Sequence, residues 1–222
     1  NIIIVGGGSA GWMSAATLIS QFPDKKITVM ESPNVPTVGV GESTLAHING
    51  WLHMLGIKDE DFMPHTDASY KLSIRFENFY KKGDGGFHYP FGNAVENNKL
   101  GLKQLWFVKK FLQPKTPITE YANWLYQNMA MVNNNTLFKN KNKELDHFNF
   151  QYHTAYHFDA TKFGLWLRDH YCKPKGVKHI IEDVNAIETN KNGIVSLNKK
   201  HKADMFIDCT GFKSMLLGDT LK

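Results

Sequence analysis

Residues 2–12 read Ile-Ile-Ile-Val-Gly-Gly-Gly-Ser-Ala-Gly-Trp, and this stretch decides the fold. The β-branched run at residues 2–5 is typical of a strand that is buried on both faces of a parallel sheet. A G-x-G-x-x-G motif follows at once, and residues 12–19 then have the composition of a helix that ends before Pro23. Residues 26–30 predict a second strand, which ends on Glu31. The order strand, glycine turn, helix and strand indicates a dinucleotide-binding unit.

Each position of the motif meets a physical requirement of dinucleotide binding. Gly6 permits the tight turn, Gly8 lets the backbone N–H groups at the helix N-terminus approach a pyrophosphate, and Gly11 lets the helix lie close to the strand. Glu31 lies 20 residues after Gly11, where a carboxylate can accept hydrogen bonds from ribose hydroxyls. An acid at this position disfavours a 2′-phosphate, so FAD or NAD is preferred over NADP. A glycine-rich turn in an unrelated α/β domain is the alternative, but the complete unit favours dinucleotide binding.

Composition and charge exclude several other classes of protein. The 222 residues include 26 Lys and Arg against 21 Asp and Glu, a net charge of +5 with histidine neutral. The lysines occur as separated pairs such as Lys81-Lys82 and Lys199-Lys200 and not as a stripe, so no nucleic-acid partner is indicated. A hydrophobic content of 42% supports a sizeable core and excludes intrinsic disorder.

Residues 1–23 carry no charge, which is also a property of membrane spans and signal peptides. Four glycines and several hydroxyl side chains interrupt this segment, so a buried strand and helix is the better interpretation, and no membrane partner is expected. Cys172 and Cys209 show neither disulfide nor zinc spacing, which favours a reducing, cytoplasmic location. The chain starts at Asn1 without methionine, so we expect a portion of a longer protein.

The segment after Glu31 is a loop rich in Pro and Gly that enters a predicted helix over residues 45–55. Residues 38–44 of this loop read Val-Gly-Val-Gly-Glu-Ser-Thr. Together with residues 6–13, this loop resembles the flavin-dependent halogenases of the tryptophan-halogenase type. The resemblance continues through residues 67–76, 87–92, 155–160 and 206–212, and it is weakest over residues 93–150. Related flavin hydroxylases share the first glycine motif but lack this loop joined to the Tyr70-Lys71 segment.

The resemblance implies an α/β, Rossmann-like FAD-binding fold of the flavin monooxygenase and halogenase type, with an inserted substrate-side region. Residues 1–60 and 151–222 would form the FAD-binding core, residues 61–150 would form the substrate-side strands and insertion, and the C-terminal part of the family would be missing. The cofactor would be FAD, used as FADH2. The residues expected to bind it are Gly6, Gly8, Ser9, Ala10, Gly11, Glu31, Val40, Gly41, Glu42, Ser43, Thr44 and Val184.

Lys71 is the expected catalytic residue. In the resembling family, a lysine at this motif position faces a tunnel between flavin and substrate and holds hypohalous acid or captures it covalently. A compact ammonium is a suitable donor to a hypohalous acid or a halide, and a desolvated amine of lowered pKa could form a haloamine. The alternation of apolar and polar residues over 70–77 also fits an exposed strand face, on which Lys71 would be an ordinary surface lysine.

No metal site is expected. His153, His157 and Asp159 are closely spaced, but no H-E-x-x-H motif is present. A buried or capping role for these histidines is the better interpretation. The five tryptophans, Trp12, Trp51, Trp106, Trp124 and Trp166, suit a core or the wall of a pocket for a flat arene, and none is assigned to substrate.

By resemblance, the expected activity is FADH2- and O2-dependent halogenation of an electron-rich arene of indole or phenol type. The expected partners are a separate flavin reductase, a halide ion and the small aromatic substrate. The W-x-W-x-I-P motif and the partner glutamate of the family are not found in this sequence, and the family's later region, where its halide-binding Thr-Gly beside the flavin is expected, is not represented. Three alternatives remain: an NAD(P)H-dependent FAD aromatic hydroxylase, a catalytically inactive FAD-binding protein or redox sensor, and a plain NAD dehydrogenase.

Overall fold

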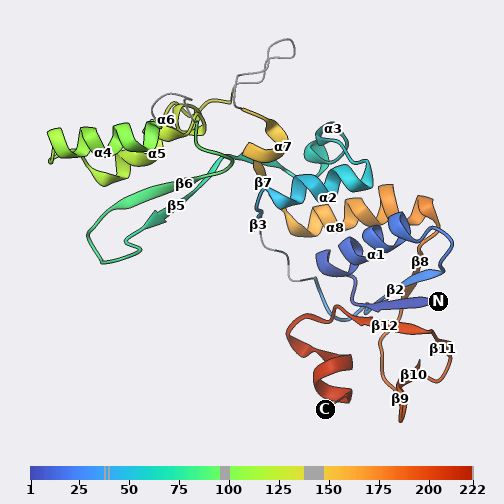
Figure 1. Cartoon of the computed structure of the whole chain (residues 1–222). Coiled ribbons are helices and arrows are strands. Elements are labelled where there is room, and N and C mark those ends of the chain that lie inside the picture. Colours follow the sequence, from blue (N-terminus) through green and yellow to red (C-terminus); the bar gives the residue numbers. More distant parts are fainter. Residues whose placement is uncertain (38, 40, 96–100, 138–147, 222) are drawn as a thin grey trace. The chain divides into compact units, whose positions relative to one another are not determined.

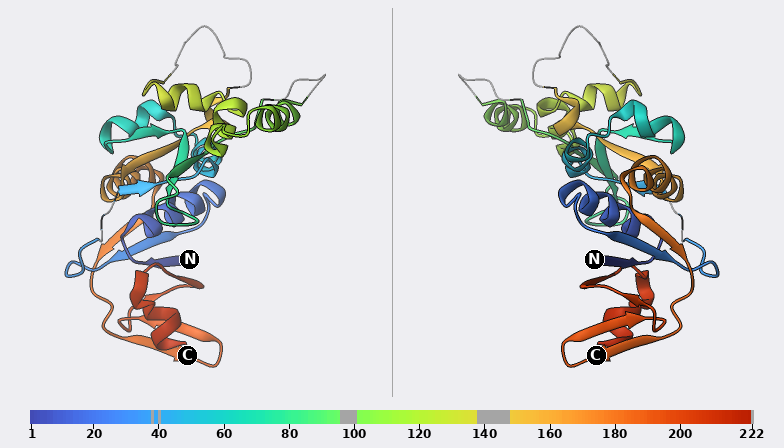
Figure 2. Two further views of the ribbon diagram at one scale, coloured as in Figure 1. Left: turned by 90° about the vertical axis from the view of Figure 1, so that its left-hand side faces the viewer. Right: turned by 90° about the vertical axis from the view of Figure 1, so that its right-hand side faces the viewer.

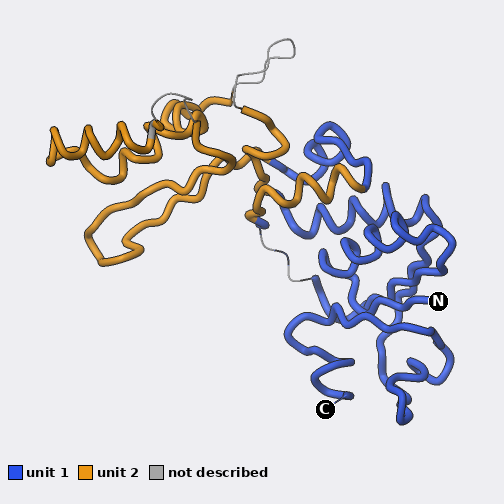
Figure 3. Tube along the Cα trace, in the orientation of Figure 1, with its two compact units in different colours: residues 1–42, 55–68, 158–222 blue, residues 43–54, 69–157 orange. Residues whose placement is uncertain are grey.

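The computed structural model describes residues 1–37, 39, 41–95, 101–137 and 148–221 (Figure 1). The chain divides into two compact units (Figure 3). The first unit comprises residues 1–42, 55–68 and 158–222, and the second comprises residues 43–54 and 69–157. Residues 43–54 therefore pack with the second unit, although the sequence prediction grouped them with the cofactor-binding core. The cofactor and substrate roles of the two regions stay predictions.

A four-stranded parallel sheet is the centre of the first unit. Its strand order is β12 (Met205–Asp208), β1 (Ile2–Val5), β2 (Ile27–Glu31) and β8 (Lys178–Ile181). Every neighbouring pair is parallel, with Ile2 of β1 level with Met205 on one side and Ile27 on the other. The carboxyl ends of the strands therefore lie along one edge of the sheet, which is where α/β proteins bind ligands.

Helices cover one face of this sheet. The helix α1 (Ser9–Gln21) packs against β1 and β2 and against α8 (Ala160–Trp166), which continues as a π-helical segment (Leu167–Cys172). Trp12, Ala15 and Ala16 of α1 are fully buried. Because alanine side chains are small, the axis of α1 can lie close to the strands. This packing agrees with the buried strand and helix that were predicted for the uncharged residues 1–23.

The opposite face of the sheet is covered by the C-terminal segments of the first unit. Side chains alternate along a strand, so Ile3 and Val5 point to this face and pack with Leu197 and Leu216. Leu197 belongs to an antiparallel sheet of β9 (Ile187–Asn190), β10 (Gly193–Leu197) and β11 (His201–Lys202). Figure 2 shows α1 and these C-terminal segments on opposite sides of the parallel strands.

The second unit is built from short strands and helices. Its residues 43, 69–71 and 155–157 belong to a three-stranded sheet of the order β3 (Gly41–Ser43), β7 (Ala155–Asp159) and β4 (Ser69–Lys71). Within the unit, β5 (Ser73–Glu77) pairs with β6 (Gly86–Pro90). Its helices are α2 (His47–Leu55), α4 (Leu102–Leu112), α5 (Tyr121–Leu125), α6 (Asn128–Asn133) and α7 (Phe150–His153). The second unit also contains the 3-10 turn Ile118–Glu120. The remaining elements belong to the first unit and are α3 (Asp59–Phe62), the 3-10 turns Met63–His65, Lys173–Lys175 and Gly211–Lys213, and the π-helical segment Met215–Thr220.

The predicted α/β, Rossmann-like fold is confirmed, including the hairpin at the Asn192-Gly193 turn. The alternating segment at residues 70–77 differs in one respect, because it forms two strands that separate at Leu72. The Leu72 carbonyl accepts hydrogen bonds from the Phe91 N–H (3.0 Å) and from the Asn128 side chain (3.1 Å), so it does not continue the ladder of β4. Within the described ranges, no helix is both long and apolar enough to cross a membrane.

Candidate functional site

The glycine turn of the first unit leaves the N-terminus of α1 open. Gly6 has a φ of +117°, a conformation that residues with a side chain rarely adopt. A Cβ atom on Gly6 would overlap the Cys209 carbonyl, and one on Gly11 would overlap the Gly6 carbonyl. Gly8 precedes the helix and provides no capping side chain, and its nearest neighbour would be a Thr37 methyl group 3.8 Å away. The N–H groups of the first turn can therefore receive an anion.

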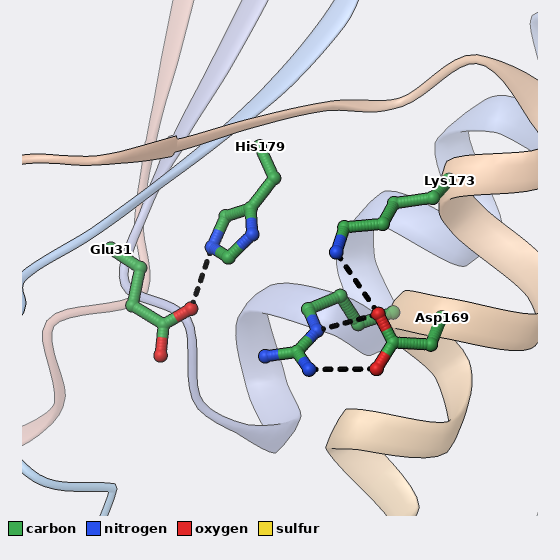
Figure 4. A network of polar contacts seen from close by, with 5 residues as sticks. Glu31, Asp169, Lys173 and His179 are labelled. Atoms are coloured by element: carbon green, nitrogen blue, oxygen red, sulfur yellow. Dashed lines mark hydrogen bonds and ion pairs between the residues drawn. The ribbon is translucent and has the colours of Figure 1, made fainter.

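Glu31 ends β2 beside this turn. A Cβ atom on Gly7 would overlap the Glu31 carboxylate, so the carboxylate lies directly against the glycine backbone. The Glu31 Oε2 atom is 2.8 Å from Nε2 of His179, and Figure 4 shows the imidazole pointing at this oxygen. His179 lies on the adjacent strand β8 and also contacts the Trp12 ring edge-on, with 5.0 Å between the ring centroids. One carboxylate oxygen is thus held by His179, and the other can accept a ribose hydroxyl.

His179 was missed by the sequence analysis. The only signal was a polar residue within an otherwise apolar strand, and such a residue has many explanations. The strand register explains the contact with Glu31. In the β2–β8 pair, His179 is level with Val29, which lies two residues before Glu31 on β2. Side chains two residues apart on a strand share one face of the sheet, so His179 can reach Glu31.

A charged cluster lies near the same edge in the first unit. Asp169 accepts hydrogen bonds from Arg168 (2.7 Å) and Lys173 (3.0 Å), and these contacts hold the pKa of its carboxyl well below its usual range (Figure 4). The hydrogen bond to Asp169 raises the pKa of Arg168, and the negative charge of Glu31 contributes to this rise. The Arg168 guanidinium is therefore within electrostatic reach of Glu31.

The other predicted cofactor residues of the first unit are placed as follows. Ser9 and Ala10 form the first turn of α1, and Val184 packs against the core beneath the sheet. Asp183, which precedes Val184, accepts hydrogen bonds from the side chains of Ser32 and Asn34 and so ties the loop after β2 to this segment. Gly41 and Glu42 are exposed residues of β3. Val40 lies outside the described residues.

Lys71 is buried in the second unit, with 7% of the residue exposed. The Nζ atom donates to the Ser43 hydroxyl (2.8 Å) and to the Thr44 carbonyl (2.9 Å). The Nζ atom also lies 5.3 Å from the centroid of the Phe91 ring. Among the residues that the structure describes, no carboxylate forms an ion pair with Lys71. The interpretation of Lys71 as an exposed surface lysine is therefore wrong.

Burial changes the ionisation of Lys71 and of its neighbour. The pKa of the Lys71 amine is lowered because burial desolvates its charged form. The pKa of His157 is also lowered, first by burial and then by the positive charge of Lys71. In the β4–β7 pair, Lys71 is level with Ala155 and Ser69 with His157, so the lysine and the histidine are diagonal neighbours on one sheet face.

The two histidines considered as metal ligands differ, because His157 is exposed on β7 and does not have the buried or capping role that was expected. His153 is buried, its Nδ1 atom accepts a hydrogen bond from the Asn149 N–H (2.8 Å), and burial lowers its pKa. Asp159 caps α8 by accepting a hydrogen bond from the Lys162 N–H (2.8 Å). Over residues 1–37, 41–95, 101–137 and 148–221, no group of three or more His, Cys, Asp or Glu side chains is arranged to hold a metal ion.

The predicted site residues thus form two sets. The structure brings Glu31 to the glycine turn in the first unit, and it brings Ser43 and Thr44 to Lys71 in the second. Ser43 and Thr44 were predicted to bind the cofactor, and their observed side-chain and carbonyl contacts with Lys71 were not expected.

Comparison with known proteins identifies relatives of the whole chain. The family described as "Tryptophan halogenase" matches residues 1–222. Tryptophan 6-halogenase ThaL of Streptomyces albogriseolus is 30% identical over 241 residues, which cover 100% of this chain and 44% of ThaL. The apo structure of VirX1 superposes with a TM-score of 0.86 at 40% identity, over 98% of this chain and 43% of VirX1.

A third relative is Xcc4156, a flavin-dependent halogenase from Xanthomonas campestris, with a TM-score of 0.79 and 28% identity over 99% of this chain and 44% of Xcc4156. The chain spans less than half the length of the curated relatives that it matches. Since the family match extends over every residue and accords with the glycine turn and the Rossmann-like sheet, the chain belongs to the tryptophan halogenase family.

Proposed function

We propose that this protein is a flavin-dependent halogenase that uses FADH2, O2 and a halide to halogenate an electron-rich arene of indole or phenol type. Lys71 holds the hypohalous acid in this proposal. The observation that carries it is the burial of Lys71 among neutral partners, in a chain whose relatives are named tryptophan halogenases. An amine that is withdrawn from water and lacks a carboxylate partner in the described part of the chain suits a reactive role better than a stabilising one.

The residues of the first unit fit FAD. The open N-terminus of α1 can receive the pyrophosphate, because Gly8 has no side chain and the first turn contains no acidic residue. One oxygen of Glu31 is held by His179, and the second oxygen can accept a ribose hydroxyl. When bound in its reduced form, FAD together with O2 supplies the oxidising equivalents that convert halide into hypohalous acid.

Lys71 has one N–H direction left after its bonds to Ser43 and Thr44. This N–H donates to the oxygen of the hypohalous acid, which withdraws electron density from the O–X bond and makes the halogen more electrophilic. The arene then forms a carbon–halogen bond while the O–X bond breaks. The released hydroxide takes the proton of the same ring carbon, so the products are the haloarene and water.

The remaining partners follow from this chemistry. A separate flavin reductase supplies FADH2, because the proposed reaction consumes the reduced cofactor at each turnover. We place the protein in the cytoplasm, on the support of Cys172 and Cys209, which are both free thiols. Burial raises the pKa of Cys172 to about 12, so this thiol is unreactive.

The test is a halogenation assay with FAD, a flavin reductase, NADH and O2. Chloride, bromide or iodide is offered with a panel of indoles, including tryptophan, and phenols, and products are identified by mass spectrometry. We expect mass shifts specific to the halide that disappear in Lys71→Ala and persist in Lys81→Ala, a matched change at an exposed lysine. Both variants must bind FAD as the wild type does.

Two results would contradict the proposal. Addition of oxygen without any dependence on halide would indicate an FAD-dependent aromatic hydroxylase. Bound FAD without any product from the panel would indicate a catalytically inactive flavin-binding protein.

A further inference from the structure

The hydrogen bonds of Lys71 set the direction of its amine. Nζ donates to two acceptors, the Ser43 hydroxyl at 2.8 Å and the Thr44 carbonyl at 2.9 Å. Two short hydrogen bonds from one nitrogen fix both its position and the orientation of its third N–H. The direction of the third N–H of Lys71 is therefore determined by its acceptors on residues 43 and 44 and not by Lys71 alone.

The two acceptors differ in how firmly they are held. Thr44 is anchored to Tyr156 by its N–H (2.9 Å) and its hydroxyl (3.0 Å), and the Tyr156 N–H donates back to the Thr44 hydroxyl (2.9 Å). The Thr44 carbonyl is thus a fixed part of the backbone, which no side-chain substitution removes. The Ser43 hydroxyl is a single side-chain atom, so its contribution can be removed without disturbing the strand.

The environment leaves little else to orient the amine. Phe91 offers only the face of its ring, 5.3 Å from Nζ, which attracts a cation without fixing its direction. In the described part of the chain, Lys71 has no ion pair that would substitute for the serine. Ser43 itself is exposed, so the loss of its hydroxyl leaves no cavity in the core.

We propose that Ser43 is a positioning residue, whose hydroxyl holds the Lys71 amine so that its remaining N–H points at the reactant. The role differs from cofactor binding, which was the expectation for Ser43 from sequence. The inference rests on the proposed function for the identity of the reactant. The Ser43–Lys71 contact itself can be tested without any turnover.

The first readout is the ionisation of Lys71, measured by NMR on FAD-loaded protein that carries 13C at the lysine ε position. The Lys71 signal is assigned by its disappearance in Lys71→Arg. A hydroxyl that accepts from the ammonium favours the charged form. We therefore expect the Lys71 titration to move to lower pH in Ser43→Ala and to return to the wild-type position in Ser43→Thr, which restores a hydroxyl.

The matched control is Ser69→Ala, which removes an exposed serine hydroxyl from β4, the strand of Lys71. We expect no change of the Lys71 titration in this variant. The inference is overturned if Ser43→Ala titrates as the wild type does, or if Ser43→Thr behaves as Ser43→Ala does. Circular dichroism establishes that each variant is folded.

The second readout is the rate of halogenation. In Ser43→Ala we expect kcat to fall on the order of tenfold, which is the effect of one misplaced charge-assisted hydrogen bond, while the FAD affinity is unchanged. If Ser43→Ala loses FAD affinity while the Lys71 titration is unchanged, Ser43 is a cofactor-binding residue and the inference is overturned.

The two readouts separate this inference from the proposed function. If the titration shifts but the wild type forms no halogenated product, the positioning role stands and the halogenase proposal fails. If Lys71→Ala abolishes halogenation but Ser43→Ala changes neither titration nor rate, the halogenase proposal stands and the positioning role fails.

Discussion

The glycine turn of the first unit and the contacts of Lys71 in the second differ in how far their residues are separated along the chain. Gly6, Gly8 and Gly11 lie within six residues of sequence, and each answers a requirement of one turn and one helix. Lys71 meets Ser43 and Thr44 across 28 and 27 residues, and only the folded β3-β7-β4 sheet brings them together. Local backbone geometry can thus be predicted from a sequence, whereas the environment of a side chain depends on strand order and register.

The largest effect is expected at Gly11. A Cβ atom there would overlap the Gly6 carbonyl, a backbone atom that can move only with the turn. Gly11→Ala should lower the free energy of unfolding by roughly 1–3 kcal/mol and weaken FAD binding on the order of 100-fold. Urea unfolding and titration of flavin fluorescence measure the two effects.

Gly50→Ala is the matched control, because a Cβ atom on Gly50 in α2 would have no neighbour within 4 Å. Alanine is a better helix former than glycine, so we expect stabilisation by about 0.5–1 kcal/mol and unchanged FAD affinity. Equal FAD affinity in both variants would show that the turn does not hold the cofactor.

A smaller effect is expected at His179, the residue that the local motif did not reveal. His179→Leu removes the group that holds one oxygen of Glu31. FAD binding should weaken by roughly 2- to 10-fold, the net effect of one hydrogen bond. Isothermal titration calorimetry measures the affinity.

His65→Leu makes the same change at an exposed histidine of the first unit and should leave the FAD affinity unchanged. If both histidine variants lose affinity equally, or neither does, the Glu31–His179 contact plays no part in cofactor binding.

The smallest effect is a pH dependence of stability at Lys71. Burial lowers the folded-state pKa of Lys71 below the value of 10.5 that an unperturbed lysine has. Between these two values the unfolded chain binds the extra proton, so folding becomes more favourable as the pH rises. Relative to Lys71→Met, the wild type should therefore gain stability from pH 7 toward pH 10.5, by an amount on the order of 1 kcal/mol or less. Urea unfolding of both proteins over this range measures the difference, and a difference that is constant or shrinks with rising pH would contradict the burial of a charged amine.

The fold could be predicted to a large extent. The apolar run at residues 2–5 and the glycines fixed β1, the turn and α1 in the prediction, and the Asn192-Gly193 turn identified the β9–β10 hairpin. Residues 205–207 were predicted to return to the sheet, but their pairing with β1 was not predicted. Hydrophobic periodicity identifies a strand and does not identify its partner about 200 residues away.

The candidate site was predicted in its residues but not in its contacts. Lys71 was identified by resemblance, and its alternation with apolar neighbours was equally compatible with an exposed strand. In the structure it is buried, and its amine contacts Ser43, Thr44 and Phe91, which lie 20 or more positions away along the chain. Ser43 was assigned to the cofactor because it lies in a loop with a family resemblance, and no local pattern indicated its contact with the lysine.

We propose two separate roles, in which the glycine turn with Glu31 holds the cofactor and Lys71 carries the halogenation. The most direct measurement determines FAD affinity and halogenated product in Glu31→Ala and in Lys71→Met. We predict that Glu31→Ala weakens FAD binding and regains product formation when FAD is raised to saturation, whereas Lys71→Met binds FAD as the wild type does and forms no halogenated product at any FAD concentration. Halogenated product from Lys71→Met at the wild-type rate would contradict the account.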